Sequence, residues 1–177
     1  MDALVVQNPR KMGYLAVDDP RALTRADFIR LGLLTGAGEE MPYSEAHLGD
    51  FEARYCYDRF WCAVGRAPNT RYLSCGHALV VVGDARSAFF LNSEAGVLGQ
   101  FRHQHFLLFL IAHFQKAALL MFSDRLVQAL MALDLSSPGG VRRFKRAIRA
   151  SLEGFLRFTH RYWFHEISEQ AHVRALW

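Results

Sequence analysis

The stretch FRHQHFLLFLIAHFQKAALLMFSDRLVQALMAL, residues 101–133, contains neither proline nor glycine and is apolar over most of its length. The absence of breakers over so long a stretch predicts one uninterrupted helix. From Phe106 to Ala112 the side chains are apolar in nearly every direction around the helix axis, so one neighbouring helix cannot cover them all. We therefore expect the domain that precedes this helix, or other copies of the chain, to bury the remainder.

A second helix is predicted from Val141 to Trp177, where Gly154 is the only breaker. Apolar side chains recur in it at helical spacing, and most of the arginines occupy the other side, which is typical of an amphipathic helix packed on a partner. Residues 134–140, DLSSPGG, combine capping serines with proline and glycine and predict a tight turn. Residues 98–177 should therefore form a long antiparallel helical hairpin.

The chain before residue 98 alternates short apolar segments with breakers. ALVVQ (3–7), GYLAV (13–17) and RYLSCGHALVVVGD (71–84) are typical of strands. Thr24 and the following RADFIRLGLLTG predict a capped helix over 25–35 that stops at Gly36. A second helix is predicted over about 44–63, with these residues inward: Leu48, Phe51, Tyr55, Phe60 and Cys62.

The predicted fold class is therefore α+β. A small α/β subdomain, residues 1–97, with short strands and two helices, precedes the hairpin. Hydrophobic residues make up 51% of the 177 residues and charged residues 21%, which excludes a disordered chain.

The net charge of +4 is unevenly distributed along the chain. Residues 135–177 hold eight Lys or Arg against three Glu, whereas residues 1–134 hold 13 basic and 14 acidic side chains. A nucleic acid or an anionic lipid surface could bind the basic segment. Long Arg side chains also cover apolar helix surface while they stay solvated, which is the simpler interpretation.

No stretch reaches the roughly 18 to 20 uninterrupted apolar residues of a transmembrane helix. The nearest candidate, Phe106 to Phe122, has Lys116 near its centre, so we expect a buried helix of a soluble protein. The cysteines, Cys56, Cys62 and Cys75, are odd in number, and no apolar signal-type run precedes them. This favours a reducing, cytoplasmic setting.

The histidines do not form a metal motif on a helix. His160 and His165 are five residues apart, about 140° around a helix, whereas a zinc pair needs a spacing of three or four. We interpret them as packing residues of a helical interface. Cys75 and His77 lie two apart in a strand-like run, so their side chains share one face and form an alternative zinc pair.

No catalytic residues are predicted. The serines lack a Gly-x-Ser-x-Gly elbow, and the sequence contains neither a P-loop nor a Gly-x-Gly-x-x-Gly motif, so we do not expect an enzyme. Association through aromatic side chains is the favoured hypothesis. The interface candidates are Phe106, Phe109, Phe155, Tyr162 and Trp163.

Residues 98–177, above all FTHRYWFHEIS at 158–168, resemble the helical region of bacterial CorA-like divalent cation transporters. The resemblance implies a cytoplasmic α/β domain followed by long helices that bundle into a pentameric funnel. It also implies membrane helices near a Gly-Met-Asn motif, and neither occurs in these 177 residues. We thus expect the oligomerising and ion-sensing domain of a magnesium transporter, at the cytoplasmic face of the inner membrane, with the membrane reached only through a further part of the parent protein.

The resemblance also implies that carboxylates at subunit contacts sense the divalent ion. No motif transfers those positions to this sequence, so the candidates rest on the preference of Mg²⁺ for hard oxygen ligands. They are Asp18, Asp19, Asp84, Asp124 and Asp134, each of which could equally be a cap or turn residue. Mg²⁺ or another divalent cation is an optional cofactor. The alternative function is a non-transport binding module whose basic face contacts nucleic acid or anionic lipid, although no nucleic-acid partner is expected for the transporter domain.

Overall fold

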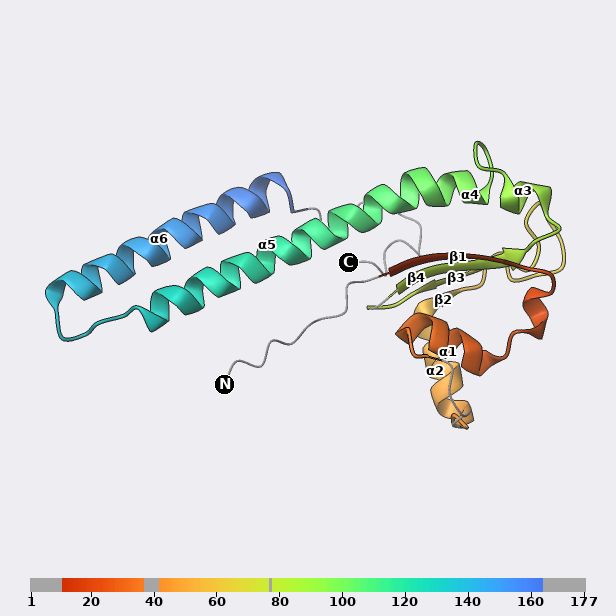
Figure 1. The fold of residues 1–177 in the computed structure, drawn as a ribbon, viewed down its shortest axis with the longest axis horizontal. Coiled ribbons are helices and arrows are strands. Elements are labelled where there is room, and N and C mark those ends of the chain that lie inside the picture. Colours follow the sequence, from red (N-terminus) through yellow and green to blue (C-terminus); the bar gives the residue numbers. More distant parts are fainter. Residues whose placement is uncertain (1–10, 37–41, 77, 164–177) are drawn as a thin grey trace. The chain divides into compact units, whose positions relative to one another are not determined.

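A computed structural model describes residues 11–36, 42–76 and 78–163. The chain divides into two compact units, one comprising the chain up to Leu108 and another that begins at Phe109. The first unit holds a sheet with short helices, and the second holds most of helix α5 and all of helix α6 (Figure 1). The predicted α+β class with a helical hairpin is confirmed. The predicted strand at 3–7 lies outside the described residues.

A mixed sheet in the order β1-β4-β3-β2 forms the centre of the first unit. Its strands are β1 (Lys11–Val17), β2 (Cys56–Tyr57), β3 (Arg71–Ser74) and β4 (Ala78–Asp84). β1 runs parallel to β4, with Gly13 opposite Val80, so a crossover must join them, and η1 (Pro20–Ala22), α1 and α2 lie within it. The β2–β3 and β3–β4 pairs are antiparallel.

Helix α1 (Arg25–Leu33) begins with the cap that the sequence predicts. The amide of Asp27 donates to Thr24 Oγ1 at 3.2 Å, and the amide of Thr24 donates to the Asp27 carboxylate at 2.8 Å. These reciprocal bonds satisfy two amides that the first helical turn leaves free. The helix ends at Leu34, whose φ of 56° is left-handed, two residues before the predicted stop at Gly36.

Helix α2 (Glu45–Tyr55) is shorter than the predicted helix over 44–63. The chain leaves the helix at Cys56 because Cys56 and Tyr57 pair with Leu73 and Tyr72 as β2. The predicted burial of Leu48 and Phe51 is confirmed. It is wrong for Tyr55 and Phe60, which are 37% and 41% exposed, whereas Cys62 is half-buried.

Both faces of β4 are covered, and the strand is buried at every position. Alternate side chains of a strand point to opposite faces, so Val80 and Val82 pack with Phe28 of α1 while Val81 packs with Phe90. Phe90 belongs to α3 (Ala88–Leu91), and a Cβ at Gly83 would come 2.3 Å from its ring. The core therefore closes on both sides of the sheet.

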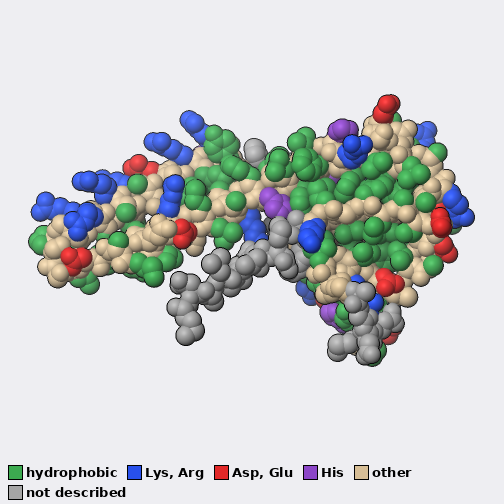
Figure 2. All heavy atoms as spheres, viewed as in Figure 1, with side chains coloured by type: hydrophobic (Ala, Val, Ile, Leu, Met, Phe, Trp, Pro, Cys, Tyr) green, Lys and Arg blue, Asp and Glu red, His purple; other side chains and the backbone are tan. Residues whose placement is uncertain are grey.

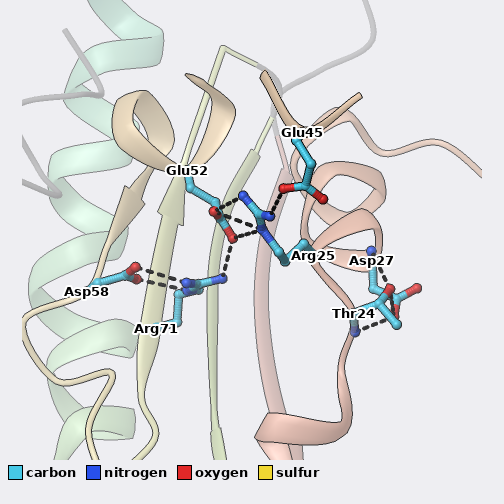
Figure 3. A network of polar contacts seen from close by, with 7 residues as sticks. All are labelled: Thr24, Arg25, Asp27, Glu45, Glu52, Asp58 and Arg71. Atoms are coloured by element: carbon cyan, nitrogen blue, oxygen red, sulfur yellow. Dashed lines mark hydrogen bonds and ion pairs between the residues drawn. The ribbon is translucent and has the colours of Figure 1, made fainter. Parts of the chain in front are cut away.

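A buried guanidinium fastens the loop after β2 to the sheet (Figure 3). The Arg71 side chain is 6% exposed, and it donates to both carboxylate oxygens of Asp58, at 2.8 and 2.9 Å. Its guanidinium carbon lies 4.4 and 4.5 Å from the ring centres of Phe28 and Trp61. Glu52 approaches Arg71 to 3.7 Å and also accepts from Arg25 at 2.7 Å. The acids thus compensate a charge that the sheet buries.

Candidate interaction surface on the helical hairpin

The helical segment from Val97 to Met131 is continuous. It consists of α4 (Val97–Gln100), a π-helical turn η2 (Phe101–His105) and α5 (Phe106–Met131). The partner helix, α6 (Pro138–Arg161), begins three residues before the predicted start at Val141, inside the predicted turn 134–140. Ser137 caps it, because the amide of Gly140 donates to Ser137 Oγ at 3.0 Å. The predicted continuation of this helix to Trp177 is wrong, because α6 ends at Arg161 and the described residues Tyr162 and Trp163 are not helical. Residues 164–177 lie outside the described part of the chain.

Aromatic side chains join α5 to α6. The Phe122 ring of α5 lies 5.8 Å from Phe155 and 5.9 Å from Phe158 of α6, measured between ring centres. A Cβ at Gly154 would lie 3.2 Å from Phe122 Cε1, so the missing side chain lets the two helices approach there. Near the open end of the hairpin, Gln115 Nε2 donates to the carbonyl oxygen of Tyr162 at 3.0 Å. One stripe of α5 is therefore covered by α6.

The rest of α5 is apolar but exposed. Its buried residues are Phe109, Ala112, Gln115, Phe122 and Ala129. From Leu110 onward, the large hydrophobic side chains between 37% and 83% exposed are Leu110, Phe114, Leu119, Leu120, Met121, Leu126, Val127, Leu130 and Met131. Two apolar grooves, of about 360 and 550 Å³, flank the Phe122 contact. The described residues therefore leave much of this helix uncovered, and its expected burial by other copies of the chain stays a prediction.

By length and composition, the helix Val97–Met131 could cross a membrane, contrary to the expectation from the sequence. Within its most apolar stretch of 18 residues, only 28% is buried. Length and composition do not distinguish a bilayer from a protein partner, because the core helix of a soluble assembly meets the same criteria. The polar side chains around the helix therefore decide between these environments.

The exposed apolar face of α5 and the basic face of α6 point in opposite directions. Residues nine apart in a helix lie about 180° around the axis. His113 and Met131 are each nine residues from Phe122, and Arg149 is nine residues from Phe158. Because Phe122 and Phe158 mark the contact between the two helices, His113 and Met131 face away from α6, and Arg149 faces away from α5.

The outer face of α6 is strongly basic. All its Lys and Arg side chains are exposed, and none forms a salt bridge with another described residue. They gather along α6 (Figure 2) and are Arg142, Arg143, Lys145, Arg146, Arg149, Arg157 and Arg161. Glu153 is the one acidic residue of this helix. The basic face is thus solvated, as in an amphipathic helix that packs on one side.

The interface candidates divide between packed and open positions. Phe155 packs on Phe122, and Phe109 is buried with its ring centre 4.2 Å from that of His113. The ring centre of Trp163 lies 6.1 Å from that of Phe158. Phe106 and Tyr162 are each 51% exposed. Some of these aromatic side chains therefore pack within the hairpin or along α5, while others remain available to a partner.

The carboxylates proposed for magnesium are not brought to one place. Asp18 and Asp19 follow β1, and Asp84 ends the parallel strand β4 opposite Val17. Arg86 donates twice to Asp84 at 3.0 Å, and these hydrogen bonds hold the pKa of that carboxyl below its usual range. The pKa of Arg86 is raised, first by Asp84 and more weakly by Asp19 and Asp18. The Arg86 guanidinium therefore already occupies the place beside these carboxylates that a metal ion would take.

The remaining two carboxylates belong to the second unit. Asp124 accepts a hydrogen bond from Gln128 Nε2 at 2.7 Å on α5. Asp134 accepts from the amide of Ser136 at 2.9 Å in the turn, and hydrogen bonds from Ser136 and Ser137 lower its pKa. The described residues contain no group of three His, Cys, Asp or Glu that could hold a metal ion.

Of the alternative zinc pair, Cys75 and His77, only Cys75 lies in the described part of the chain. Cys75 is buried, and its thiol donates to the carbonyl oxygen of Gly32 with an S···O distance of 2.6 Å. His77 lies outside the described residues. Burial raises the pKa of the nearby Cys56 thiol to about 12, which disfavours the thiolate that a metal or a nucleophilic reaction would need.

Comparison with protein-family models, with curated proteins and with solved structures finds no match.

Proposed function

We propose that this chain is a self-associating scaffold domain in which α5 joins the copies. The observation that carries the proposal is the exposed apolar surface of α5 from Leu110 to Met131. Nine large apolar side chains at about half exposure offer several hundred Å² of apolar surface. A stable interface needs about 800 Å² from each partner. The apolar surface of α5 is thus comparable in scale to one side of such an interface, which supports the proposal.

A protein partner fits this surface better than hydrocarbon does. Lys116, Asp124 and Arg125 lie within α5, and each charged side chain at the centre of a bilayer costs about 3 kcal/mol. A bilayer around the hairpin would also meet the basic face of α6. A second copy presents the same apolar surface and leaves the basic faces in water.

The test is the molar mass of the full chain by size-exclusion chromatography with light scattering, over a range of loading concentrations. Leu120→Glu places a charge on the outer face of α5, where Leu120 is 52% exposed. Leu156→Glu is the matched control, because Leu156 is 47% exposed on α6. We expect an oligomer for the wild type and for Leu156→Glu, and a monomer for Leu120→Glu. A monomeric wild type at every concentration would contradict the proposal.

Membership of a CorA-like transporter, with magnesium as the sensed ion, stays a prediction. Its test is to measure the oligomer mass and the melting temperature in millimolar magnesium and again in the presence of a chelator. A divalent ion bound between subunits would raise both, because a ligand that binds only the assembled state stabilises it. If neither changes, the ion-sensing hypothesis loses its support, whereas self-association is unaffected.

A second candidate function is favoured by the unpaired cations of α6. Seven Lys or Arg side chains on one helix, against Glu153, would attract an anionic lipid surface. Flotation with neutral vesicles and with vesicles that contain phosphatidylglycerol separates the two cases. Binding that requires the anionic lipid and disappears in Arg146→Glu/Arg149→Glu would support it, and equal behaviour with both vesicles would remove it.

A further inference from the structure

The outer face of α5 carries a heptad pattern that α6 does not use. Side chains spaced alternately by three and four residues form one stripe along a helix, the spacing of a coiled-coil seam. The stripe opposite Phe122 consists of Leu110, His113, Ala117, Leu120, Asp124 and Val127. His113 is half-buried and the other five are exposed. The same spacing continues to Phe106 and Met131 at the two ends of α5. We call these eight residues the outer seam.

The outer seam is complementary to the outer seam of a second copy that runs in the antiparallel direction. In an isologous two-fold interface, residue i of one copy contacts residue j of the other, and j contacts i. An antiparallel pairing centred between Ala117 and Leu120 places Leu110 against Val127 and the small Ala117 against the larger Leu120. It also places His113 against Asp124.

A parallel pairing gives a less favourable set of contacts. Each seam residue would then face its own copy, so Asp124 would lie against Asp124 and His113 against His113. Like charges placed opposite each other across an interface are destabilising. The outer seam has one histidine and one carboxylate, and only the antiparallel arrangement joins them.

The local contacts leave both groups able to reach a partner. His113 Nδ1 lies 2.8 Å from the carbonyl oxygen of Phe109, a contact that holds the ring and leaves Nε2 for another group. Asp124 Oδ2 accepts from Gln128 at 2.7 Å, and its second oxygen has no hydrogen-bond partner among the described residues. A charge-assisted hydrogen bond between Nε2 and that oxygen would satisfy both across the seam.

We infer that α5 associates with a second copy of itself in an antiparallel, two-fold arrangement held by the outer seam and by two reciprocal His113–Asp124 contacts. The inference rests on the proposed self-association and adds its partner orientation. In this dimer α5 lies between its own α6 and the α5 of the other copy. The basic faces of the two α6 helices therefore point outward on opposite sides, where their like charges are solvated.

Cysteine cross-linking tests the orientation. In the antiparallel dimer, position 110 lies beside position 127 of the other copy and roughly 25 Å from its own equivalent, since 17 residues rise 1.5 Å each. Full-length Leu110→Cys and Val127→Cys chains are oxidised separately and after mixing. Peptide mass spectrometry separates the new disulfides from any that involve Cys56, Cys62 or Cys75. We expect a 110–127 disulfide in the mixture and no 110–110 disulfide in the single variant.

The possible results separate the inference from the proposed function. A 110–110 disulfide with an intact oligomer, as a parallel ring of subunits would give, overturns the antiparallel arrangement and leaves self-association standing. A monomer in the absence of oxidant overturns both. Insertion of a monomer into neutral vesicles or detergent micelles, which would make hydrocarbon the occupant of the seam, also overturns both.

Charge reversal provides an independent test of the His113–Asp124 contact. His113→Asp places two carboxylates opposite each other twice in the antiparallel dimer, and we expect the dissociation constant to rise about tenfold or more. Adding Asp124→His should recover most of this loss, because the pair is then restored with its partners exchanged. In a parallel arrangement the double variant still places like groups together. Failure of the double variant to recover, with helix content unchanged by circular dichroism, would contradict the inference.

Discussion

Strand β4 and helix α5 are both strongly apolar, yet they are covered to different extents. β4 is buried at all seven positions, because helices lie on both faces of its sheet. Along α5, α6 covers one stripe, and side chains such as Leu110 and Met131 remain 53% and 83% exposed. Apolar composition therefore predicts that a segment will be buried, but not which part of the protein, or which partner, buries it. The sheet is covered within its own unit, whereas α5 requires a partner.

The largest difference is expected between two leucine truncations. Leu73 in β3 is 0% exposed, so Leu73→Ala should lower the free energy of unfolding of the first unit by about 2 to 5 kcal/mol, through lost burial and a cavity. Leu120→Ala should change the unfolding free energy of the monomer by about 0.5 kcal/mol or less. Urea titration at low protein concentration measures both. Equal losses would show that the two regions do not differ as described.

A smaller effect is expected at the buried guanidinium. Asp58→Ala leaves the Arg71 side chain, 6% exposed, without its two strongest hydrogen bonds. We expect a loss of about 1 to 3 kcal/mol, because a desolvated charge loses its partner while Glu52 compensates it only in part. The matched control is Asp50→Ala, which removes the exposed pair with Arg54 and should cost about 0.5 kcal/mol or less. A loss as small as that of the control would contradict the structural role given to Arg71.

The smallest effect is expected at the cap of α1. Thr24→Ala removes hydrogen bonds to Asp27 and should cost about 1 kcal/mol. The side-chain and then the backbone hydrogen bonds from Thr24 lower the pKa of Asp27 in the folded chain. A lowered pKa contributes stability above the unfolded value, about 3.9, which is lost as pH falls through the folded value. The difference between Thr24→Ala and the wild type should thus be larger at pH 6 than at pH 2. Unfolding free energies that differ equally at both pH values would contradict this.

The features that the sequence predicts correctly depend on neighbouring residues. Thr24 and Asp27 define the start of α1, because capping is local chemistry. Ser137 and Pro138 were assigned to a turn, whereas Ser137 caps α6 and the helix begins at Pro138. Strand β2 was missed because Cys56 depends on pairing with Leu73, which no local pattern indicates. Arg71 gave no signal of burial for the same reason, since Asp58 and Trp61 come from a separate loop.

The sequence predicts the long helix that carries the candidate surface, but not which of its side chains stay exposed. The heptad spacing of the outer seam is present in the sequence, yet α5 is apolar in so many directions that no single stripe stands out. The Phe122 contact identifies the stripe that α6 covers, and therefore the stripe that remains. The proximity of Asp18 and Asp19 to the Asp84–Arg86 pair was not predictable either, because it follows from the parallel pairing of β1 with β4.

Hydrogen exchange at two protein concentrations tests the central claim most directly, because it reports on both regions in one sample. Amides of α5 between Leu110 and Met131 should exchange more slowly at the higher concentration, since a second copy covers the helix and opposes its local opening. Amides of β3 and β4, already covered within their own unit, should exchange at the same rate at both concentrations. Exchange in α5 that is independent of concentration would contradict the claim that this helix is completed by another copy of the chain.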